Sequence, residues 1–263
     1  MKRRVILSAA LSLAALVPLL HAGTAQADTL ADIKKAGTLK VAVPQDYPPF
    51  GSVGGDMKPL GYDIDMATAI AKDLGVKLEL VPVTSANRIP YLTTHKVDLV
   101  ISSLGKTPER EKVLDFSSPY APYFTGVFGI PEEKVSKAED LAGKTIGVTR
   151  GTLEDLELTK IAPSSTTIKR FEDNNGTISA FLSGQVTLVG IGNVVAASIV
   201  AKNPPKKPET KFIIKDSPCY VGLNKGEAAL MTAVNASIAK AKQAGALNQM
   251  SQKWLGVPLP ASI

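Results

Sequence analysis

Cysteine is nearly absent from this chain of 263 residues, which holds only Cys219, and histidine is almost as rare, with His21 and His95. A single cysteine excludes an internal disulfide, and so few cysteine and histidine side chains argue against a zinc site. The sequence also lacks a glycine-rich phosphate loop, a nucleophile elbow and internal repeats. We therefore expect no metal and no cofactor, and we interpret Cys219 as a small buried residue.

Long apolar runs are missing as well, except near the N-terminus. Residues 1–27 carry three cations at positions 2–4, then an apolar run, then Ala25-Gln26-Ala27. This order is typical of a secretory signal peptide cleaved before Asp28, and the run is too short for a membrane span. No cysteine stands directly after the cleavage site, which argues against a lipid anchor. We therefore expect a mature chain that starts at residue 28 and lies in a bacterial periplasm.

A strong excess of one charge is also missing. The chain has 30 Lys and Arg against 24 Asp and Glu, and removal of residues 1–27 leaves 27 cations against the same 24 acids. A basic stripe with interleaved aromatic residues, typical of nucleic-acid binding, is absent. The short run "NPPKKPETK" near residue 206 fits a solvated loop. We expect a monomer that binds no nucleic acid.

Strand and helix patterns alternate twice along the rest of the chain. Each series has the order strand, helix, strand, helix, strand, helix, which predicts an α/β fold with mainly parallel sheets covered by helices. Ligands of such sheets bind beyond the carboxyl ends of the strands. Two such units facing each other predict a cleft. The predicted strands are 37–45, 76–83, 97–103, 141–151, 166–171, 186–192 and 211–216; the predicted helices are 61–75, 87–96, 152–162, 174–185, 193–203 and most of 226–256, with a further helix that starts at Thr107.

The stretch "SSLGKTPEREKVLDFS", residues 102–117, places a cation where a helix start favours an anion. Thr107 can cap the helix and Pro108 suits its first position. Glu109 matches the positive end of the helix dipole, whereas Arg110 does not. An anion bound next to Arg110 explains the arrangement. The alternative is a surface arginine paired with a neighbouring glutamate.

Several segments in this order resemble the periplasmic amino-acid-binding proteins of ABC transporters, which are the family-3 extracellular solute-binding proteins. They are "GTLKVAVPQDYPPF", "GYDIDMATAIAKDLG", "KVDLVISSLGKTPEREKVLDFSSPY", "AEDLAGKTIGVTRGT" and the closing "KW", and the similarity spans about residues 37 to 256. The resemblance implies a two-lobed, type II periplasmic binding protein fold with two hinge crossovers. Lobe 1 takes residues 28–122 and 216–263, and lobe 2 takes residues 123–215.

The resemblance also implies a carboxylate clamp. In the family, the arginine of the "TPER" segment, here Arg110, pairs with the α-carboxylate of the ligand, and the serine seven residues earlier, Ser103, donates to it. Gly105, between them, is a further candidate. The facing lobe adds the "GT" at a helix start, here Gly151 and Thr152, whose N–H groups favour an anion.

A second segment, "VTSANRIP", resembles the glutamate/aspartate-binding branch of the family. The resemblance implies that Ser85 and Arg88 reach the ligand, with Arg88 on a side-chain carboxylate. The alternative for Arg88 is a cation on a helix surface. Tyr47, in "QDYPPF", stands where the family often has an aromatic lid over the ligand, although a core tyrosine explains it equally.

Three positions depart from the family pattern. Where the family has an aspartate for the ligand's ammonium group, this chain has Gly192, followed by Asn193, and the glycine leaves space for water or a larger ligand. The acidic-amino-acid branch also has a histidine near Asn174 and an arginine near Pro44. A buried ammonium group needs an anionic partner. Asp46 and Glu154 are the nearest candidates for that partner.

We therefore interpret the chain as the periplasmic solute-binding component of an ABC importer, not an enzyme, which captures a polar or acidic amino acid by hinge closure and docks on a membrane permease. A binder of an amine-free mono- or dicarboxylate is the alternative that Gly192 leaves open. A dehydratase on the same scaffold, with Glu154 or Asp173 as the acid, has no specific pattern in its favour. A receptor module is also less well supported, since no membrane span or output domain follows "KWLGVPLP".

Overall fold

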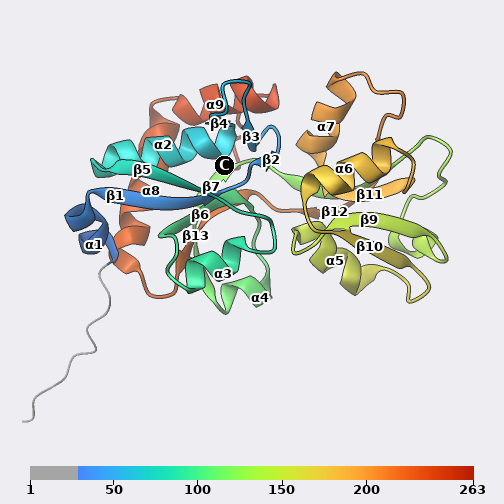
Figure 1. Ribbon diagram of the computed structural model, residues 1–263, viewed down its shortest axis with the longest axis horizontal. Helices are drawn as coiled ribbons and strands as arrows, with labels where there is room; N and C mark the ends of the chain where they lie inside the picture. Colours follow the sequence, from blue (N-terminus) through green and yellow to red (C-terminus); the bar gives the residue numbers. More distant parts are fainter. Residues whose placement is uncertain (1–28) are drawn as a thin grey trace, which may run out of the picture.

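The computed structural model describes residues 29–263, so the predicted signal peptide, residues 1–27, lies outside the described residues. Two lobes lie side by side along the longest axis of the molecule (Figure 1). Each lobe is built on its own five-stranded sheet, with the strand orders β5-β1-β6-β13-β7 and β10-β9-β11-β8-β12. The predicted two-lobed α/β fold is therefore confirmed.

The sheet of lobe 1 contains four strands that run in one direction and one, β13, that runs against both of its neighbours. Helices α2, α8 and α9 lie on one side of this sheet, and α3 lies on the other (Figure 1). The strands are β1 (Thr38–Val43), β5 (Lys77–Pro82), β6 (Leu99–Leu104), β7 (Leu114–Ala121) and β13 (Cys219–Asn224); the helices are α1 (Thr29–Ala36), α2 (Tyr62–Leu74), α3 (Arg88–Thr93), α4 (Pro108–Glu111), α8 (Ala228–Gln243) and α9 (Ala246–Leu255).

Alternation along the strands divides the apolar residues of lobe 1 between the two sides of the sheet. Leu39, Val41 and Val43 of β1 belong to the cluster that includes the buried face of α2, whereas Ala42 belongs to a second cluster with Leu92 of α3. This period of two is what a strand covered on both faces requires. Helix α2 ends at Gly75, as its sequence predicts.

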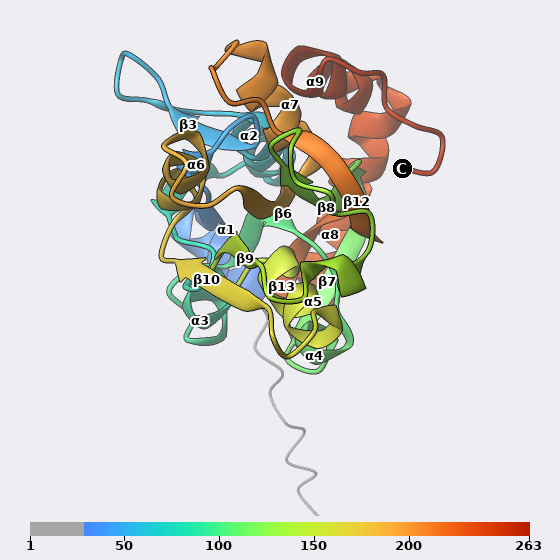
Figure 2. The ribbon, with the colours of Figure 1, turned by 90° about the vertical axis from the view of Figure 1, so that its right-hand side faces the viewer.

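The sheet of lobe 2 repeats this plan, with β8 as the one strand that runs against its neighbours. In Figure 2 this lobe faces the viewer, and α6 and α7 lie toward the top, away from α5. The strands are β8 (Phe124–Gly129), β9 (Thr145–Thr149), β10 (Thr167–Phe171), β11 (Leu188–Gly192) and β12 (Glu209–Asp216); the helices are α5 (Leu153–Ile161), α6 (Asn174–Leu182), α7 (Asn193–Ala201) and the 3-10 turn η1 (Ala138–Leu141).

Two short crossovers join the sheets. Pro122 and Tyr123 separate β7 from β8, and Ser217 and Pro218 separate β12 from β13. The two strands that run against their neighbours, β8 and β13, are the ones that follow the crossovers. Asp216, predicted for lobe 1, ends β12 of lobe 2. We therefore propose that the lobes comprise residues 28–122 with 217–263, and 123–216.

Some details of the chain differ from their prediction. The helix after Thr107 is the single turn α4, although Thr107 does cap it by accepting a hydrogen bond from the N–H of Arg110 at 3.2 Å. One turn carries little of the dipole on which the argument about Arg110 depends. The C-terminal helix is broken at residues 244–245 into α8 and α9. A small sheet, β2 (Asp46–Tyr47), β3 (Gly51–Val53) and β4 (Pro59–Leu60), was not predicted.

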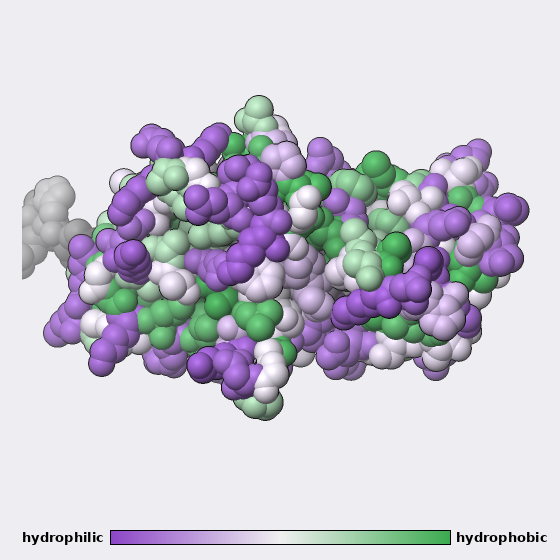
Figure 3. All heavy atoms as spheres, turned by 90° about the horizontal axis from the view of Figure 1, so that it is seen from above, coloured by the Kyte–Doolittle hydropathy of each residue, from purple (hydrophilic) through white to green (hydrophobic). Residues whose placement is uncertain are grey.

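The exposed large apolar residues are spread over both lobes, as Val53 and Met57 of lobe 1 and Ile161 and Ile213 of lobe 2 illustrate. Figure 3 shows hydrophilic side chains over much of the face seen from above, with small separate apolar areas between them. Across residues 29–263, no helix combines the length and the apolar character needed to cross a membrane. Cys219 is buried and unpaired, as predicted.

Candidate functional site

Two buried arginines of lobe 1 converge on one carbonyl oxygen of lobe 2. Arg88 begins α3 and Arg110 lies in α4, and their exposed fractions are only 3% and 4%. Both donate to the carbonyl of Gly151, Arg110 Nη2 at 3.0 Å and Arg88 Nη2 at 3.3 Å. Within lobe 1, Arg88 Nη1 donates to the carbonyl of Ser102 at 2.6 Å and Arg110 Nη1 donates to the carbonyl of Gly105 at 2.7 Å. The structure thus brings together the two arginines that the sequence predicts for the ligand.

The two guanidinium groups keep unused hydrogen-bonding capacity. The Nε atoms of Arg88 and Arg110 are buried and have no hydrogen-bond partner among residues 29–263. Burial, and after it the charge of Arg88, lowers the pKa of Arg110 to about 9, and burial lowers the pKa of Arg88 as well. Arginine side chains nevertheless keep their proton in proteins, so the site holds two cations. A buried donor without a partner costs about 1–3 kcal/mol. The pair is therefore suited to bind an anion.

Gly151 has to be a glycine because of its backbone and its neighbour. Its φ is +75°, and a Cβ atom there would lie 3.0 Å from the Cα of Ala86.

Two hydroxyl side chains predicted for the ligand lie near this contact. Ser85, the residue before Ala86, is half-buried and has no hydrogen bond to another described residue. Thr152 uses its hydroxyl within lobe 2, because it donates to the carbonyl of Thr149 and accepts from the N–H of Asp155. The Thr152 hydroxyl therefore caps α5 in this structure.

A chain of hydrogen bonds runs through the cleft and ends on a buried carboxylate. The N–H of Gly192 donates to Tyr47 Oη at 3.1 Å, the hydroxyls of Tyr47 and Tyr123 lie 2.8 Å apart, and Tyr123 donates to Glu154 Oε1 at 2.7 Å. Each hydroxyl has one proton. Since Tyr123 gives its proton to Glu154, Tyr47 must donate to Tyr123. All the donors therefore point toward Glu154.

Glu154 is a buried acid whose charge acts on both arginines. It is 2% exposed, and its negative charge raises the pKa of both Arg88 and Arg110 against the larger effect of burial. The other candidate for an ammonium partner, Asp46, commits its two oxygens to Asn174, accepting from the backbone N–H at 2.7 Å and from Nδ2 at 3.0 Å. These bonds join β2 of lobe 1 to the start of α6 in lobe 2.

The space beside Gly192 is filled, and the prediction of an open space there is wrong. A Cβ atom at this position would lie 2.3 Å from the Tyr123 ring and 2.4 Å from its hydroxyl. Asn193 is also committed, because its Oδ1 accepts from the N–H of Phe124 at 3.2 Å. Tyr123 was not a predicted site residue. The aromatic segment "YAPYFTG", which spans the predicted lobe boundary, was the available signal, but nothing in the sequence showed that Tyr123 contacts Gly192 and Glu154.

We expect Gly192→Asp to destabilise the protein rather than restore an ammonium site. The new side chain would overlap the Tyr123 ring, and such overpacking costs about 1–3 kcal/mol. Thermal unfolding measures the loss, and Tyr123→Ala in the same chain should recover part of it. Gly55→Asp is the matched control, because a Cβ atom there meets nothing within 4 Å. A Gly192→Asp variant as stable as the wild type would contradict this packing.

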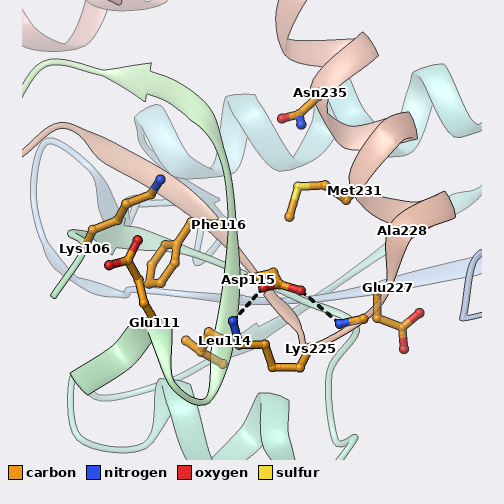
Figure 4. Close-up of a pocket in the computed structure, with 11 residues that line it drawn as sticks. Lys106, Glu111, Leu114, Asp115, Phe116, Lys225, Glu227, Ala228, Met231 and Asn235 are labelled. Atoms are coloured by element: carbon orange, nitrogen blue, oxygen red, sulfur yellow. Dashed lines mark hydrogen bonds and ion pairs between the residues drawn. The ribbon is translucent and has the colours of Figure 1, made fainter. Parts of the chain in front are cut away.

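Several cavities lie outside this cluster. One of about 490 Å³ opens at the rim of the cleft, where Asp46, Val83 and Thr84 face Asp173 and Asn175. Another of about 390 Å³ lies on lobe 1 at the starts of β7 and α8, where Asp115 accepts from Lys225 Nζ and from the N–H of Gly226 (Figure 4). The second cavity contains none of the predicted ligand residues. The buried arginine pair is therefore the better candidate site.

A metal centre has no support in the described part of the chain. No group of three or more histidine, cysteine, aspartate or glutamate side chains there is arranged to hold a metal ion. The buried polar groups of the cleft instead form hydrogen bonds and charge pairs, which suits an organic ion.

Comparison with known proteins relates most of the chain to one family. The family described as "Bacterial extracellular solute-binding proteins, family 3" matches residues 39–257. The L-cystine-binding protein TcyJ of Escherichia coli is 29% identical over 228 residues, which cover 85% of this chain and 85% of that protein.

Solved structures show the same relationship. A mutant of ArgBP from T. maritima superposes with a TM-score of 0.80 at 29% identity, covering 87% of this chain and 99% of that one. An ancestral amino-acid-binding protein, described as a precursor of cyclohexadienyl dehydratase, superposes with a TM-score of 0.79 at 32% identity, covering 86% and 99%. The similar proteins thus share the fold over their whole length.

Proposed function

Because the chain belongs to the bacterial extracellular solute-binding proteins of family 3, we propose that it is the periplasmic binding component of an ABC importer for a small amino acid with a polar or acidic side chain. The chain is exported with a signal peptide cleaved after residue 27. It closes its two lobes around one ligand molecule, as hinged binding proteins do, and then docks on a membrane permease.

The observation that carries this proposal is the buried arginine pair shared by Gly151. Arg110 takes the α-carboxylate of the ligand, and the Ser103 hydroxyl, which has no partner among residues 29–263, donates to the same group. Arg88 takes a second acidic group on the side chain of the ligand. Glu154 takes the ammonium group, in place of the aspartate that the family pattern has at position 192.

The charges in the cleft favour an acidic amino acid. Arg88, Arg110 and Glu154 together carry one net positive charge, which an acidic amino acid cancels. A dicarboxylate without an amine leaves one negative charge, and a cationic amino acid leaves two positive charges. Similar proteins are described with other ligands, since TcyJ is named for L-cystine and an ArgBP structure contains arginine. When Asp63, behind Ser103, is ionised, the net charge of these four side chains is zero and a neutral amino acid balances instead of an acidic one, so neutral ligands belong in the test.

A thermal-shift panel tests the proposal. The mature chain is heated with aspartate, glutamate, glutamine, arginine, cystine and succinate in turn. A ligand present at a hundredfold excess over its Kd stabilises the folded state by about 2.7 kcal/mol. We expect aspartate or glutamate to give the largest shift. If none of the amino acids raises the melting temperature, the proposed function is wrong.

We expect Arg88→Ala to change selectivity more than it changes the fold. Arg88 reads the distal acidic group in this proposal, so the variant should lose much more affinity for aspartate than for alanine, which lacks that group. The loss of one partner of a buried charge pair costs about 2–5 kcal/mol. Calorimetric titration with both ligands measures the difference. Equal losses for the two ligands would show that Arg88 does not contact the distal group.

A dehydratase is the second candidate, and Glu154 is the observation in its favour. A carboxyl group buried in the cleft can protonate a leaving hydroxyl group if it first takes up a proton, although Glu154 accepts a hydrogen bond from Tyr123 in this structure. One similar structure is described as a precursor of cyclohexadienyl dehydratase, although the same description calls it an amino-acid-binding protein. Incubation with a cyclohexadienyl substrate that carries a leaving hydroxyl group tests this candidate, and loss of that substrate that depends on Glu154 would support it.

A further inference from the structure

A buried aspartate behind the cleft has no place in the binding scheme described so far. Asp63 is the second residue of α2 and is 0% exposed. Its Oδ2 accepts from the N–H of Ser103 at 2.8 Å, and its Oδ1 accepts from the hydroxyl of Tyr120 at 2.6 Å. One carboxylate therefore joins the end of strand β6 to the last residues of strand β7, just before the crossover.

The backbone that Asp63 holds is strained and lies between the two arginine contacts. Ser103 has a φ of +41°, in the left-handed region that non-glycine residues rarely adopt. The carbonyl of Ser102, on one side, accepts from Arg88, and the carbonyl of Gly105, two residues beyond Ser103, accepts from Arg110. A relaxed Ser103 would reorient the peptide units that position both guanidinium groups.

The second contact of Asp63 reaches the hinge. Tyr120 is buried in β7, and its carbonyl accepts from the hydroxyl of Tyr62 at 2.8 Å. Tyr123, which donates to Glu154, follows three residues later in the crossover. The segment that Asp63 fixes through Tyr120 thus leads directly to the hydrogen-bond chain of the other lobe.

We infer that Asp63 is a positioning residue for ligand binding, which holds Ser103 in its left-handed conformation and ties that backbone to the first crossover. The expected effect of Asp63 on ligand affinity rests on the proposed function, whereas its effect on the Ser103 backbone does not. Asp63 does not contact the ligand and acts through Ser103 and Tyr120.

A change in the charge of Asp63 should change its hydrogen bonds, and this change can be measured. Burial raises its pKa to about 7, against the opposing effects of the Tyr120 and Ser103 hydrogen bonds and of the charge of Arg88. Cys219 of β13 and Tyr62 of α2 are the other titratable groups that interact with this cluster. A protonated Asp63 can still accept from Ser103, but it must donate to Tyr120 Oη, so the Tyr120 bond reverses.

Three variants separate positioning from simple packing. Asp63→Asn imitates the protonated acid, because its amide can accept from Ser103 and donate to Tyr120. Tyr120→Phe removes only the contact with β7. Asp63→Ala removes both acceptors and should weaken aspartate binding by about tenfold or more, since the Ser103 N–H loses its buried partner. Asp63→Asn keeps both contacts in the form that a protonated acid gives them, and Tyr120→Phe keeps the contact with Ser103, so both should lose less affinity than Asp63→Ala.

The experiment reads the Ser103 amide by NMR in the mature chain without ligand, and titrates aspartate by calorimetry in parallel. In the wild type the amide resonance should shift between pH 5.5 and 8.5 with a midpoint near 7, and in Asp63→Asn it should not. The wild type should also lose stability relative to Asp63→Asn as the pH rises, because the folded state holds its proton to a higher pH than the unfolded chain.

The outcomes separate this inference from the proposed function. An amide that titrates identically in the wild type and Asp63→Asn overturns the inference, as does Asp63→Ala that binds aspartate like the wild type. If Asp63→Ala does not fold, the two conservative variants decide: a tenfold loss in Asp63→Asn would mean that the ionised carboxylate, and not an acceptor for Ser103, is required. Failure of aspartate to bind the wild type contradicts only the proposed ligand, because the NMR readout needs none.

Discussion

Arg110→Ala should lose nearly all affinity for its ligand while it keeps its fold. The wild-type side chain is 4% exposed and points its donors at the carbonyls of Gly105 and Gly151, so a ligand carboxylate there is fully desolvated. The loss of one partner of a desolvated charge pair costs about 2–5 kcal/mol, which is a factor of about 30 to several thousand in Kd. Calorimetric titration with aspartate and glutamate measures the loss.

The fold should survive this change because Arg88 and Arg110 are like charges in one buried site. The charge of Arg88 lowers the pKa of Arg110, so removal of one cation relieves the other. Circular dichroism before titration confirms folding. Arg150→Ala is the matched control, because Arg150 lies next to Gly151 yet pairs with Glu172 at the surface. A folded Arg110→Ala protein with near-normal affinity would remove Arg110 from the site.

Glu154→Gln should reverse the preference between an amino acid and its amine-free analogue. Glu154 is the buried acid to which Gly192, Tyr47 and Tyr123 direct their donors. The glutamine keeps the shape but removes the charge that pairs with an ammonium group. Aspartate binding should therefore weaken by about 2 kcal/mol or more, whereas succinate binding should improve, because Glu154 no longer repels it.

Paired titrations of the wild type and the variant with aspartate and succinate measure this reversal. Glu157→Gln provides the control, since Glu157 lies one turn further along α5 and pairs with Lys215 and Lys160. If aspartate binds the Glu154→Gln variant as tightly as the wild type, another group holds the ammonium. If the wild type prefers succinate from the start, the native ligand has no amine.

The fold was readable from the sequence because local patterns determine most of it. Apolar residues of α2 recur at helical spacing up to Gly75, and the strands β1 and β6 are short apolar runs bounded by turns. The length of α4 could not be predicted, because Thr107 and Pro108 mark where a helix starts and nothing after Glu111 marks where it ends. The division of the chain into lobes came from the resemblance and not from any local pattern.

The candidate site was readable only in part. Arg88 and Arg110 could be proposed from the segments that contain them, but their convergence on Gly151 depends on how the lobes meet. Tyr123 contacts Glu154, which lies 31 positions further along the chain. Asp63 contacts Ser103, which lies 40 positions further along. Such contacts leave no periodic signal in a single sequence. Asp46 and Asn174, both proposed for the ligand, bond to each other across the cleft instead.

The measurement that tests the central claim most directly is a calorimetric titration of the mature wild-type chain with aspartate, glutamate, glutamine and succinate under one set of conditions. The buried pair of Arg88 and Arg110 opposite Glu154 predicts one binding site, with aspartate or glutamate bound more tightly than glutamine and more tightly than succinate. Tighter binding of succinate than of either acidic amino acid, or no heat of binding with any of the four, would contradict the account.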